Sequence, residues 1–221
     1  MRFRAGVSTL VATIAFAWTA GPGFLVFGAS EGNNPTITLR VLNEGAVDGR
    51  VLLQAKKEAA RIFARSGIEL VWLDCEPSGS VEWGSVSPCQ RDLGPSEFWM
   101  RLVTRGRLPS TEATGDILGF TGLEGSRTSD TSVVRYAAAV DASEKWRAGV
   151  EQILGATIAH EVGHLLLGAS AHSANGVMCG SWGRVQFERI GQGQLCFTAG
   201  QAKKLREQIE NRVRSPLAAR H

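Results

Sequence analysis

The chain has 221 residues, 43% of them hydrophobic, with 24 Lys and Arg against 21 Asp and Glu and a formal net charge of +3. A chain of this length and apolar content can bury a full hydrophobic core, which excludes an intrinsically disordered protein. The charges form no block of one sign, so the composition gives no support to nucleic-acid binding.

The N-terminal 30 residues predict an export signal. Arg2 and Arg4 precede a long uncharged stretch, whose most apolar part is followed by Gly21-Pro22-Gly23. A basic start and a short apolar stretch are typical of a signal peptide, whereas the Gly-Pro-Gly break interrupts a spanning helix of about 20 residues. We expect a signal peptide over residues 1–30, with an uncleaved N-terminal anchor as the alternative. Residues 31–221 are then a single domain, secreted or held in the cell envelope, which contacts a membrane only if the segment stays uncleaved.

Four cysteines fit an oxidising compartment. An even number of cysteines in an exported chain predicts two disulfides. We favour Cys75–Cys89 and Cys179–Cys196, because each pair brackets a stretch rich in Gly and polar residues. Closing a loop of roughly 15 residues stabilises a fold by about 3 kcal/mol. The alternative is four buried thiols or a metal site built from cysteines, which the absence of any Cys-x-x-Cys spacing disfavours.

The first part of the expected domain predicts a strand, a helix and a second strand. Residues 36–42 alternate branched apolar and polar side chains, as a half-buried strand does. Asp48 is expected to cap a helix that ends at Gly67, and residues 68–73 follow as the next strand. Because a helix of about 18 residues connects them, the two strands are expected to be parallel with a right-handed connection.

The rest of the chain predicts more strands and two more helices. Further strands are expected at residues 97–104, 116–123 and 132–140. Asp141 or Ser143 is expected to cap a long helix that Gly168 ends, and irregular loop should follow up to residue 195. Thr198 then opens a final helix with a capping-box pattern. Without an internal repeat or linker, a single domain of the α+β class accounts best for this order of elements.

The most informative segment, His160-Glu161-Val162-Gly163-His164, lies in the long predicted helix. Residues four apart lie on one face of a helix, so both imidazoles can reach one metal ion while Glu161 lies beside it. A catalytic zinc usually takes three protein ligands and leaves one position to water. His172 is the expected third ligand, since the chain can turn back at Gly168 and His172, four positions further on, can easily reach the metal. The predicted cofactor is therefore Zn²⁺, held by His160, His164 and His172.

This constellation predicts hydrolysis of peptide bonds without a covalent intermediate. Zinc would lower the pKa of its bound water towards 7 and polarise the carbonyl under attack. Glu161 would accept the proton of the attacking water and later pass it to the leaving amine. We therefore predict a secreted zinc-dependent endopeptidase, a monomer that acts on peptide or protein substrates, with Glu161 as its catalytic residue.

The motif resembles the metzincin clan of zinc metalloproteases, and within it the matrixin-like branch. Ser173 directly follows the third histidine as in matrixins, and Met178 stands where the clan has its methionine turn. The resemblance implies a metzincin-like α+β fold: a twisted mixed sheet of about four to five strands packed on two long helices, with a C-terminal loop region and a final helix. It also implies that residues 117–121 form an edge strand that aligns an extended substrate, and that Trp182, just after the methionine turn, lines the cleft.

The spacing to the third histidine departs from the clan's pattern. Metzincins have His-Glu-x-x-His-x-x-Gly-x-x-His, whereas here three residues lie on each side of Gly168. Two alternatives therefore stand beside the main prediction. One is a thermolysin-like zinc peptidase with Glu188 as third ligand, and the other is a non-catalytic exported zinc-binding protein.

Overall fold

The computed structural model describes residues 34–76, 87–105, 117–121 and 130–215. The predicted leader, residues 1–30, lies outside the described residues. The described parts form five strands and five helices in the order β1 (Thr36–Asn43), α1 (Gly49–Ala64), β2 (Glu69–Cys75), β3 (Glu97–Val103), β4 (Gly119–Thr121), β5 (Thr131–Arg135), α2 (Tyr136–Trp146), α3 (Val150–Leu167), α4 (Arg184–Gly191) and α5 (Ala199–Arg214). No helix within these ranges has both the length and the apolar character needed to cross a bilayer.

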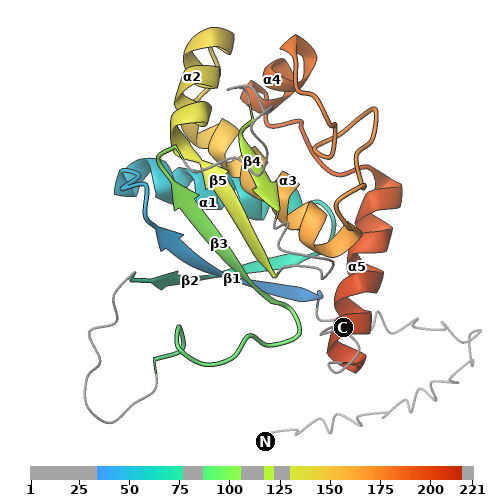
Figure 1. Cartoon of the computed structure of the whole chain (residues 1–221). Coiled ribbons are helices and arrows are strands. Elements are labelled where there is room, and N and C mark those ends of the chain that lie inside the picture. Colours follow the sequence, from blue (N-terminus) through green and yellow to red (C-terminus); the bar gives the residue numbers. More distant parts are fainter. Residues whose placement is uncertain (1–33, 77–86, 106–116, 122–129, 216–221) are drawn as a thin grey trace, which may run out of the picture. The chain divides into compact units, whose positions relative to one another are not determined.

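The strands form one mixed sheet in the order β2-β1-β3-β5-β4 (Figure 1). The pairs β1–β2, β1–β3 and β3–β5 are parallel, whereas β4 pairs antiparallel with β5 at one edge. The β1-α1-β2 unit is thus parallel, as the sequence predicts. The two long helices, α1 and α3, lie together against one face of the sheet, which confirms the predicted α+β architecture.

The core lies between this face of the sheet and the two long helices. Ile37, Leu39 and Val41 of β1 are fully buried on alternate positions, and 13 of the 18 residues of α3 are buried. A Cβ atom at Gly155 of α3 would lie only 2.6 Å from the backbone oxygen of Ala55 in α1, so the two helices approach each other backbone to backbone there. Such close packing holds α3, which carries the histidine motif, rigidly in place.

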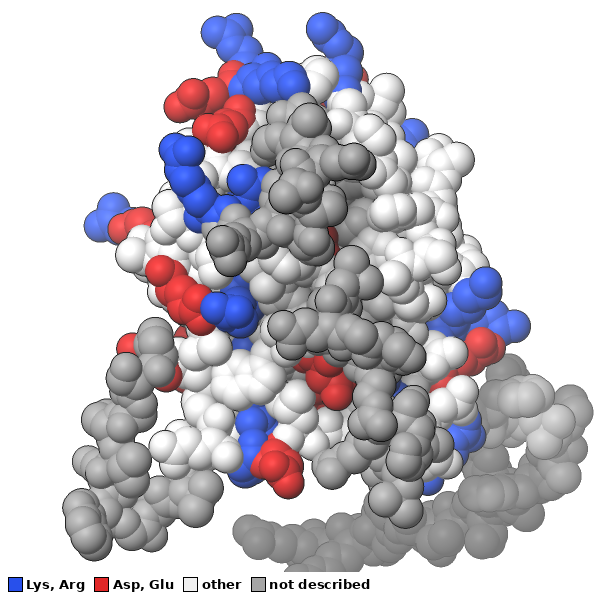
Figure 2. Space-filling view, in the orientation of Figure 1, with Lys and Arg blue, Asp and Glu red and all other residues white. Residues whose placement is uncertain are grey.

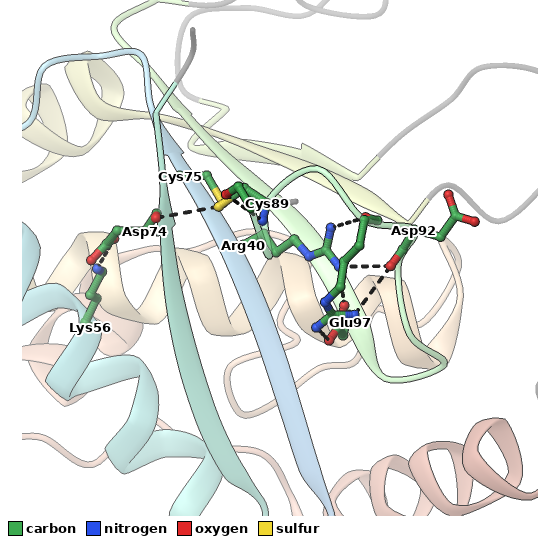
Figure 3. Close-up of a disulfide and its surroundings, with 9 residues drawn as sticks. Arg40, Lys56, Asp74, Cys75, Cys89, Asp92 and Glu97 are labelled. Carbon is green, nitrogen blue, oxygen red and sulfur yellow. Dashed lines mark hydrogen bonds and ion pairs between the residues drawn. A yellow bond between two sulfur atoms is a disulfide. The ribbon is translucent and has the colours of Figure 1, made fainter. Parts of the chain in front are cut away.

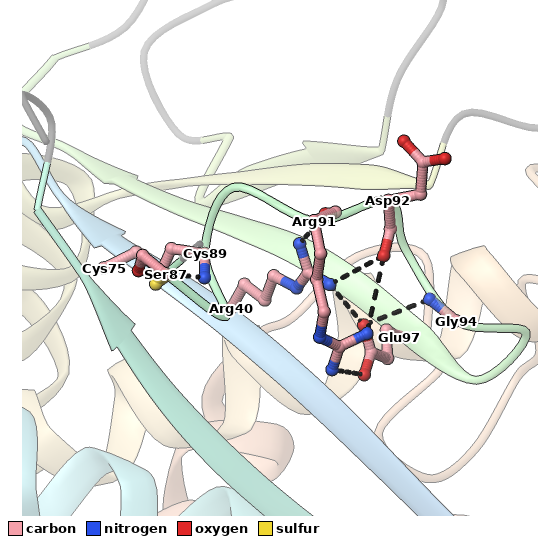
Figure 4. Close-up of polar contacts among 8 residues, drawn as sticks. All are labelled: Arg40, Cys75, Ser87, Cys89, Arg91, Asp92, Gly94 and Glu97. Carbon is pink, nitrogen blue, oxygen red and sulfur yellow. Dashed lines mark hydrogen bonds and ion pairs between the residues drawn. A yellow bond between two sulfur atoms is a disulfide. The ribbon is translucent and has the colours of Figure 1, made fainter. Parts of the chain in front are cut away.

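The opposite face of the sheet carries a buried ion pair. Arg40 of β1 is 1% exposed, and its guanidinium donates hydrogen bonds to the backbone oxygens of Arg91 (2.6 Å) and Asp92 (3.0 Å) and to the Glu97 carboxylate (Figure 4). The Arg91 guanidinium pairs with the other carboxylate oxygen of Glu97. These contacts fix the segment before β3 against β1.

The cysteines pair only in part as predicted. The disulfide Cys75–Cys89 is confirmed and joins the end of β2 to the segment that covers Arg40 (Figure 3). The predicted Cys179–Cys196 pair is wrong, because both are free thiols. Their side chains have different surroundings: the Cys196 sulfur lies 3.7 Å from Nη1 of Arg61 on α1, while the Cys179 sulfur lies 3.2 Å from the backbone oxygen of Ser181.

Two predicted elements, a strand and a helix, have clearly different boundaries in the structure. The strand predicted over residues 132–140 ends at Arg135, where the alanine-rich α2 begins. The predicted long helix is interrupted, since Arg147 adopts a left-handed conformation (φ 55°) and α3 starts only after Gly149. Asp141 and Ser143 therefore lie inside α2, and neither is the N-cap of a helix.

The predicted loop after the methionine turn contains a short helix, α4. Its two buried residues, Phe187 and Ile190, are only three apart, which gives too short an apolar stripe to show helical periodicity in the sequence. The N-terminus of α4 is capped locally, because the Gly183 N–H donates to Oε1 of Gln186 (3.0 Å).

Candidate metal centre

Three histidines converge at the C-terminal end of α3. One ligand nitrogen from each of His160, His164 and His172 lies within 4.8 Å of the other two, so the group could hold a metal ion. Nε2 of His164 lies 3.0 Å from Nε2 of His160 and 3.1 Å from Nε2 of His172. Among the described residues, no other group of three or more His, Cys, Asp or Glu side chains is close enough together to do so.

The chain turn at Gly168 brings the third histidine back to the helix. Gly168 has φ 95°, a conformation that favours glycine, and its N–H donates to the backbone oxygen of His164 (2.9 Å). Gly180 leaves room for the returning ring, because a Cβ atom there would lie 3.0 Å from Cγ of His172. The extra residue on each side of Gly168 therefore does not keep His172 away from the other two histidines.

Hydrogen bonds to the backbone decide which ring nitrogen of His160 and of His164 is free to bind a metal ion. Nδ1 of His160 lies 2.7 Å from the Val177 oxygen, and Nδ1 of His164 lies 3.1 Å from the Gly168 oxygen. Since a carbonyl oxygen only accepts, both Nδ1 atoms carry the proton, and both Nε2 atoms present lone pairs to each other. Two lone pairs 3.0 Å apart repel unless a cation lies between them. Ligand nitrogens on a tetrahedral zinc lie about 3.3 Å apart, so the spacing fits such an ion.

The rings of His160, which is half-buried, and His164, which is buried, are both held neutral, as metal ligands must be. Burial lowers the pKa of His160 to about 4, against the opposing effect of the hydrogen bond to Val177. Burial also lowers the pKa of His164, and the nearby His172 adds to that shift. At neutral pH these imidazoles are ready to bind a cation without first losing a proton.

The predicted methionine turn lies directly under the motif. Met178 is fully buried, and a Cβ atom at Gly163 would lie 2.3 Å from its sulfur. The turn is closed by a hydrogen bond from the Ser173 N–H to the Met178 oxygen (2.9 Å). Its Val177 oxygen is the acceptor for His160, so the turn supports a metal-binding ring as well as packing beneath the helix.

Gln201 of α5 supports the segment that carries His172. The sequence pattern around Gln201 gives no sign of this contact. Its Nε2 donates to the Ser173 hydroxyl (2.9 Å), and its Oε1 accepts the Thr198 N–H (2.9 Å). The sequence identifies Gln201 only as part of a capping box. The structure shows that the same side chain also fixes the residue after the third histidine.

Glu161 points away from solvent towards the edge strand β4. It is 3% exposed, and its Oε2 accepts a hydrogen bond from the Thr121 hydroxyl (2.9 Å). Burial raises the pKa of Glu161 to about 8, although the bond from Thr121 opposes that shift. A cation held by the neighbouring imidazoles would favour the ionised carboxylate. The sequence includes Thr121 only as part of an edge strand and gives no sign of this contact.

Trp182 lies beside the histidines, whereas Glu188 does not. The Trp182 ring meets His160 edge-on (centroids 5.7 Å apart), and Phe187 lies behind it. Trp182 thus forms one side of the histidine site. Glu188, the alternative third ligand, is exposed on α4 and does not belong to the histidine group.

No protein-family model and no curated protein matches the chain. Solved structures do resemble it. Archaemetzincin from Methanopyrus kandleri superposes with a TM-score of 0.50 at 13% identity, over 82% of this chain and 99% of that one. A zinc-dependent peptidase from Methanocorpusculum labreanum gives a TM-score of 0.49 at 13% identity, over 76% of this chain and 99% of that one. The likeness to archaemetzincin shows that this chain has a metzincin-like fold.

Proposed function

We propose that this protein is an extracytoplasmic zinc-dependent endopeptidase, in which His160, His164 and His172 bind Zn²⁺ and Glu161 is the general base. The observation that carries the proposal is the convergence of three imidazoles beside a buried carboxylate. His160, His164 and the carboxylate of Glu161 come from helix α3, and His172 comes from the turn that follows it. The likeness in fold to archaemetzincin supports it.

The donor set suits a catalytic zinc. Three imidazole nitrogens leave one position of a tetrahedral ion open, whereas structural zinc sites use four protein ligands. Zinc in this place would supply a water of lowered pKa and a Lewis acid for the scissile carbonyl. The three-ligand group therefore supports an enzyme over the alternative of a non-catalytic zinc-binding protein. The exposed position of Glu188 gives no support to the thermolysin-like alternative.

The chain's own residues would supply the proton transfer and the alignment of the substrate. Glu161, adjacent to His160, would take a proton from the attacking water and return it to the leaving amine. Strand β4 pairs with β5 on one side, and no other described strand pairs with it. An extended peptide could add to that second edge through main-chain hydrogen bonds, which would align its scissile bond.

Separate observations support the proposed location, domain organisation and branch of the clan. The disulfide Cys75–Cys89 supports an oxidising, extracytoplasmic location for a chain with a leader over residues 1–30. Contacts group Asn33–His221 into one compact unit, which supports a single catalytic domain over residues 31–221. Ser173, after the third histidine, supports the matrixin-like branch.

Basic and acidic side chains are intermixed on one face of the molecule (Figure 2). On the face shown in Figure 2, Lys and Arg side chains lie among Asp and Glu side chains and form no single block. Nucleic-acid binding depends on clustered basic residues that neutralise phosphates. We propose a monomer that acts on peptides and binds no nucleic acid.

Glu161→Gln tests the mechanism, with Glu210→Gln on the exposed face of α5 as the matched control. We expect the wild type to bind one zinc per chain and to cleave members of a peptide library. Glu161→Gln should keep the zinc and lose at least about 100-fold in kcat, the usual scale of a general base, while Glu210→Gln behaves as the wild type. Full activity in Glu161→Gln would refute the mechanism, and a zinc-loaded wild type that cleaves no peptide would refute the function.

A further inference from the structure

We propose that Thr121, on the edge strand β4, is a positioning residue that holds the carboxylate of Glu161 in place for proton transfer. This inference rests on the proposed function. It starts from a contact between two elements distant in sequence, the strand β4 and the helix α3.

The hydroxyl of Thr121 makes a close set of polar contacts. It lies 2.9 Å from Oε2 of Glu161, 3.0 Å from the backbone oxygen of Glu161 and 2.8 Å from the hydroxyl of Ser132. Ser132, on the neighbouring strand β5, is fully buried. If the Ser132 hydroxyl donates to Thr121, the single proton of Thr121 is free to bond the carboxylate. The described residues offer no other hydrogen-bond donor to that carboxylate.

The neighbouring position on β4 leaves space for the same carboxylate. Gly119 and Thr121 are two apart, so they face the same side of the sheet, towards α3. A Cβ atom at Gly119 would lie 2.8 Å from Oε1 and 2.9 Å from Cγ of Glu161. Glycine thus provides room on one side of the carboxylate, and threonine provides a hydrogen bond on the other.

This arrangement has a consequence for catalysis. A general base works only within hydrogen-bond reach of the proton that it takes, so its position matters as much as its basicity. The strand that would pair with an extended peptide also carries the residue that orients the base. Strand β4 would therefore both align the substrate and orient the carboxylate that α3 presents to it.

A pair of substitutions separates the hydroxyl from the shape of the side chain. Thr121→Val keeps the branched shape and removes the hydroxyl, while Thr121→Ser keeps the hydroxyl and removes the methyl group. Thr38→Val, a like change on β1 away from the histidine site, serves as the matched control. The readouts are zinc per chain, midpoint of thermal unfolding, and kcat and KM on one peptide that the wild type cleaves.

We expect Thr121→Val to bind one zinc and to lose about 10- to 100-fold in kcat, the range for loss of a hydrogen bond to a charged group, with KM within about twofold. Thr121→Ser should recover kcat to within about threefold of the wild type, and Thr38→Val should match it. If Thr121→Val does not fold, Thr121→Ala takes its place as the variant without a hydroxyl.

Two results would overturn the inference. One is a zinc-loaded variant without the hydroxyl whose kcat lies within twofold of the wild type. The other is an equal loss in Thr121→Ser and Thr121→Val, which would show that the methyl group and strand packing matter instead. A zinc-loaded wild type without peptidase activity is a different outcome, because it removes the proposed function itself and the role of Thr121 with it.

Discussion

Replacement of Gly163 by alanine should destabilise the protein, although alanine is the better helix former. Gly163 lies in the C-terminal part of α3, between the two motif histidines, where its missing side chain leaves space for Met178. The added Cβ atom would lie 2.3 Å from the Met178 sulfur, 3.1 Å from its Cε and 3.2 Å from Cε1 of Phe197. Non-bonded heavy atoms prefer separations of about 3.5–4.0 Å, so the sulfur would have to retreat by more than about 1 Å.

The size of the effect follows from two opposing contributions. Exchange of glycine for alanine inside a helix raises the free energy of unfolding by about 1 kcal/mol. Overpacking a full core costs about 1–3 kcal/mol, and Met178 is fully buried, with little free space to enter. The flexible thioether keeps the cost near the middle of that range. We expect the free energy of unfolding of Gly163→Ala to fall by about 1 kcal/mol relative to the wild type.

Gly200→Ala is the matched control. Gly200 lies in the first turn of α5, and a Cβ atom there would meet nothing within 4 Å. The same exchange should therefore raise the free energy of unfolding, by up to about 1 kcal/mol. Urea unfolding of the metal-free proteins, followed by tryptophan fluorescence and extrapolated linearly to water, should place the two variants between about 1 and 2 kcal/mol apart.

A second measurement connects this packing to the metal site. The residue before Met178, Val177, accepts the hydrogen bond from Nδ1 of His160. A displaced Met178 should disturb that bond, and loss of such support typically weakens metal binding by about 10- to 100-fold. If Gly163→Ala proves as stable as Gly200→Ala and binds zinc as tightly as the wild type, Met178 does not pack under the helix as the structure has it.

Three further predictions test other parts of the molecule. His172→Ala should weaken zinc binding by more than about 100-fold, because loss of a residue that merely supports a ligand already lowers affinity by about 10- to 100-fold. Competition with a chromophoric chelator measures the zinc affinity, and tight one-to-one binding by the variant would show that His172 is not the third ligand. Glu97→Gln should lower the free energy of unfolding by about 3 kcal/mol at pH 6, because it leaves the buried Arg40 without its anionic partner (Figures 3 and 4). Burial alone would raise the pKa of Glu97, but hydrogen bonds from Arg91, Gly94 and Arg40 outweigh it and hold the pKa below 4.5. The stability from this carboxylate is therefore present above pH 4.5 and lost as the pH falls through the lowered value, so urea unfolding should show the gap between the two proteins shrinking from pH 6 towards pH 3; a constant gap would contradict it. Two of the four cysteines, Cys179 and Cys196, should react with a thiol reagent in denaturant without reductant. If no cysteine reacts, Cys179 and Cys196 form a disulfide after all.

Local signals predicted most of what lies along one stretch of chain. Asp48 is the N-cap of α1, where its side chain accepts from the N–H groups of Arg50 and Val51, and Gly168 ends α3. The spacing of His160 and His164 on one helix face brings their rings together. Each of these depends on neighbours within about one turn of helix, so the sequence pattern carries the full information.

The features that the sequence misjudged depend on contacts or conformations that no local pattern records. The strand predicted through residue 140 stops at Arg135, because α2 starts there. Arg147 takes a left-handed conformation that no propensity favours for arginine, and it divides the predicted long helix into α2 and α3. The edge strand over residues 117–121 was predicted only through the resemblance to metzincins, and β4 does lie at the edge of the sheet beside β5. The residue pattern alone could not give this position, since strand order depends on the whole sheet.

The ligands of the candidate site were easier to predict than the residues around them, because the two kinds of residue are limited in different ways. A ligand must be a histidine of suitable spacing, so chemistry limits the choice to a few positions. A supporting contact needs only one oxygen or one hydroxyl at the right place, as with the backbone oxygen of Val177 or the side chain of Thr121. Every residue has a carbonyl and many have a hydroxyl, so only the fold selects between them. Supporting contacts should control the rate of catalysis, and the ligands should control the affinity for zinc. Variants of Thr121 should therefore lower kcat at constant zinc content, while variants of His172 should lower the zinc content itself.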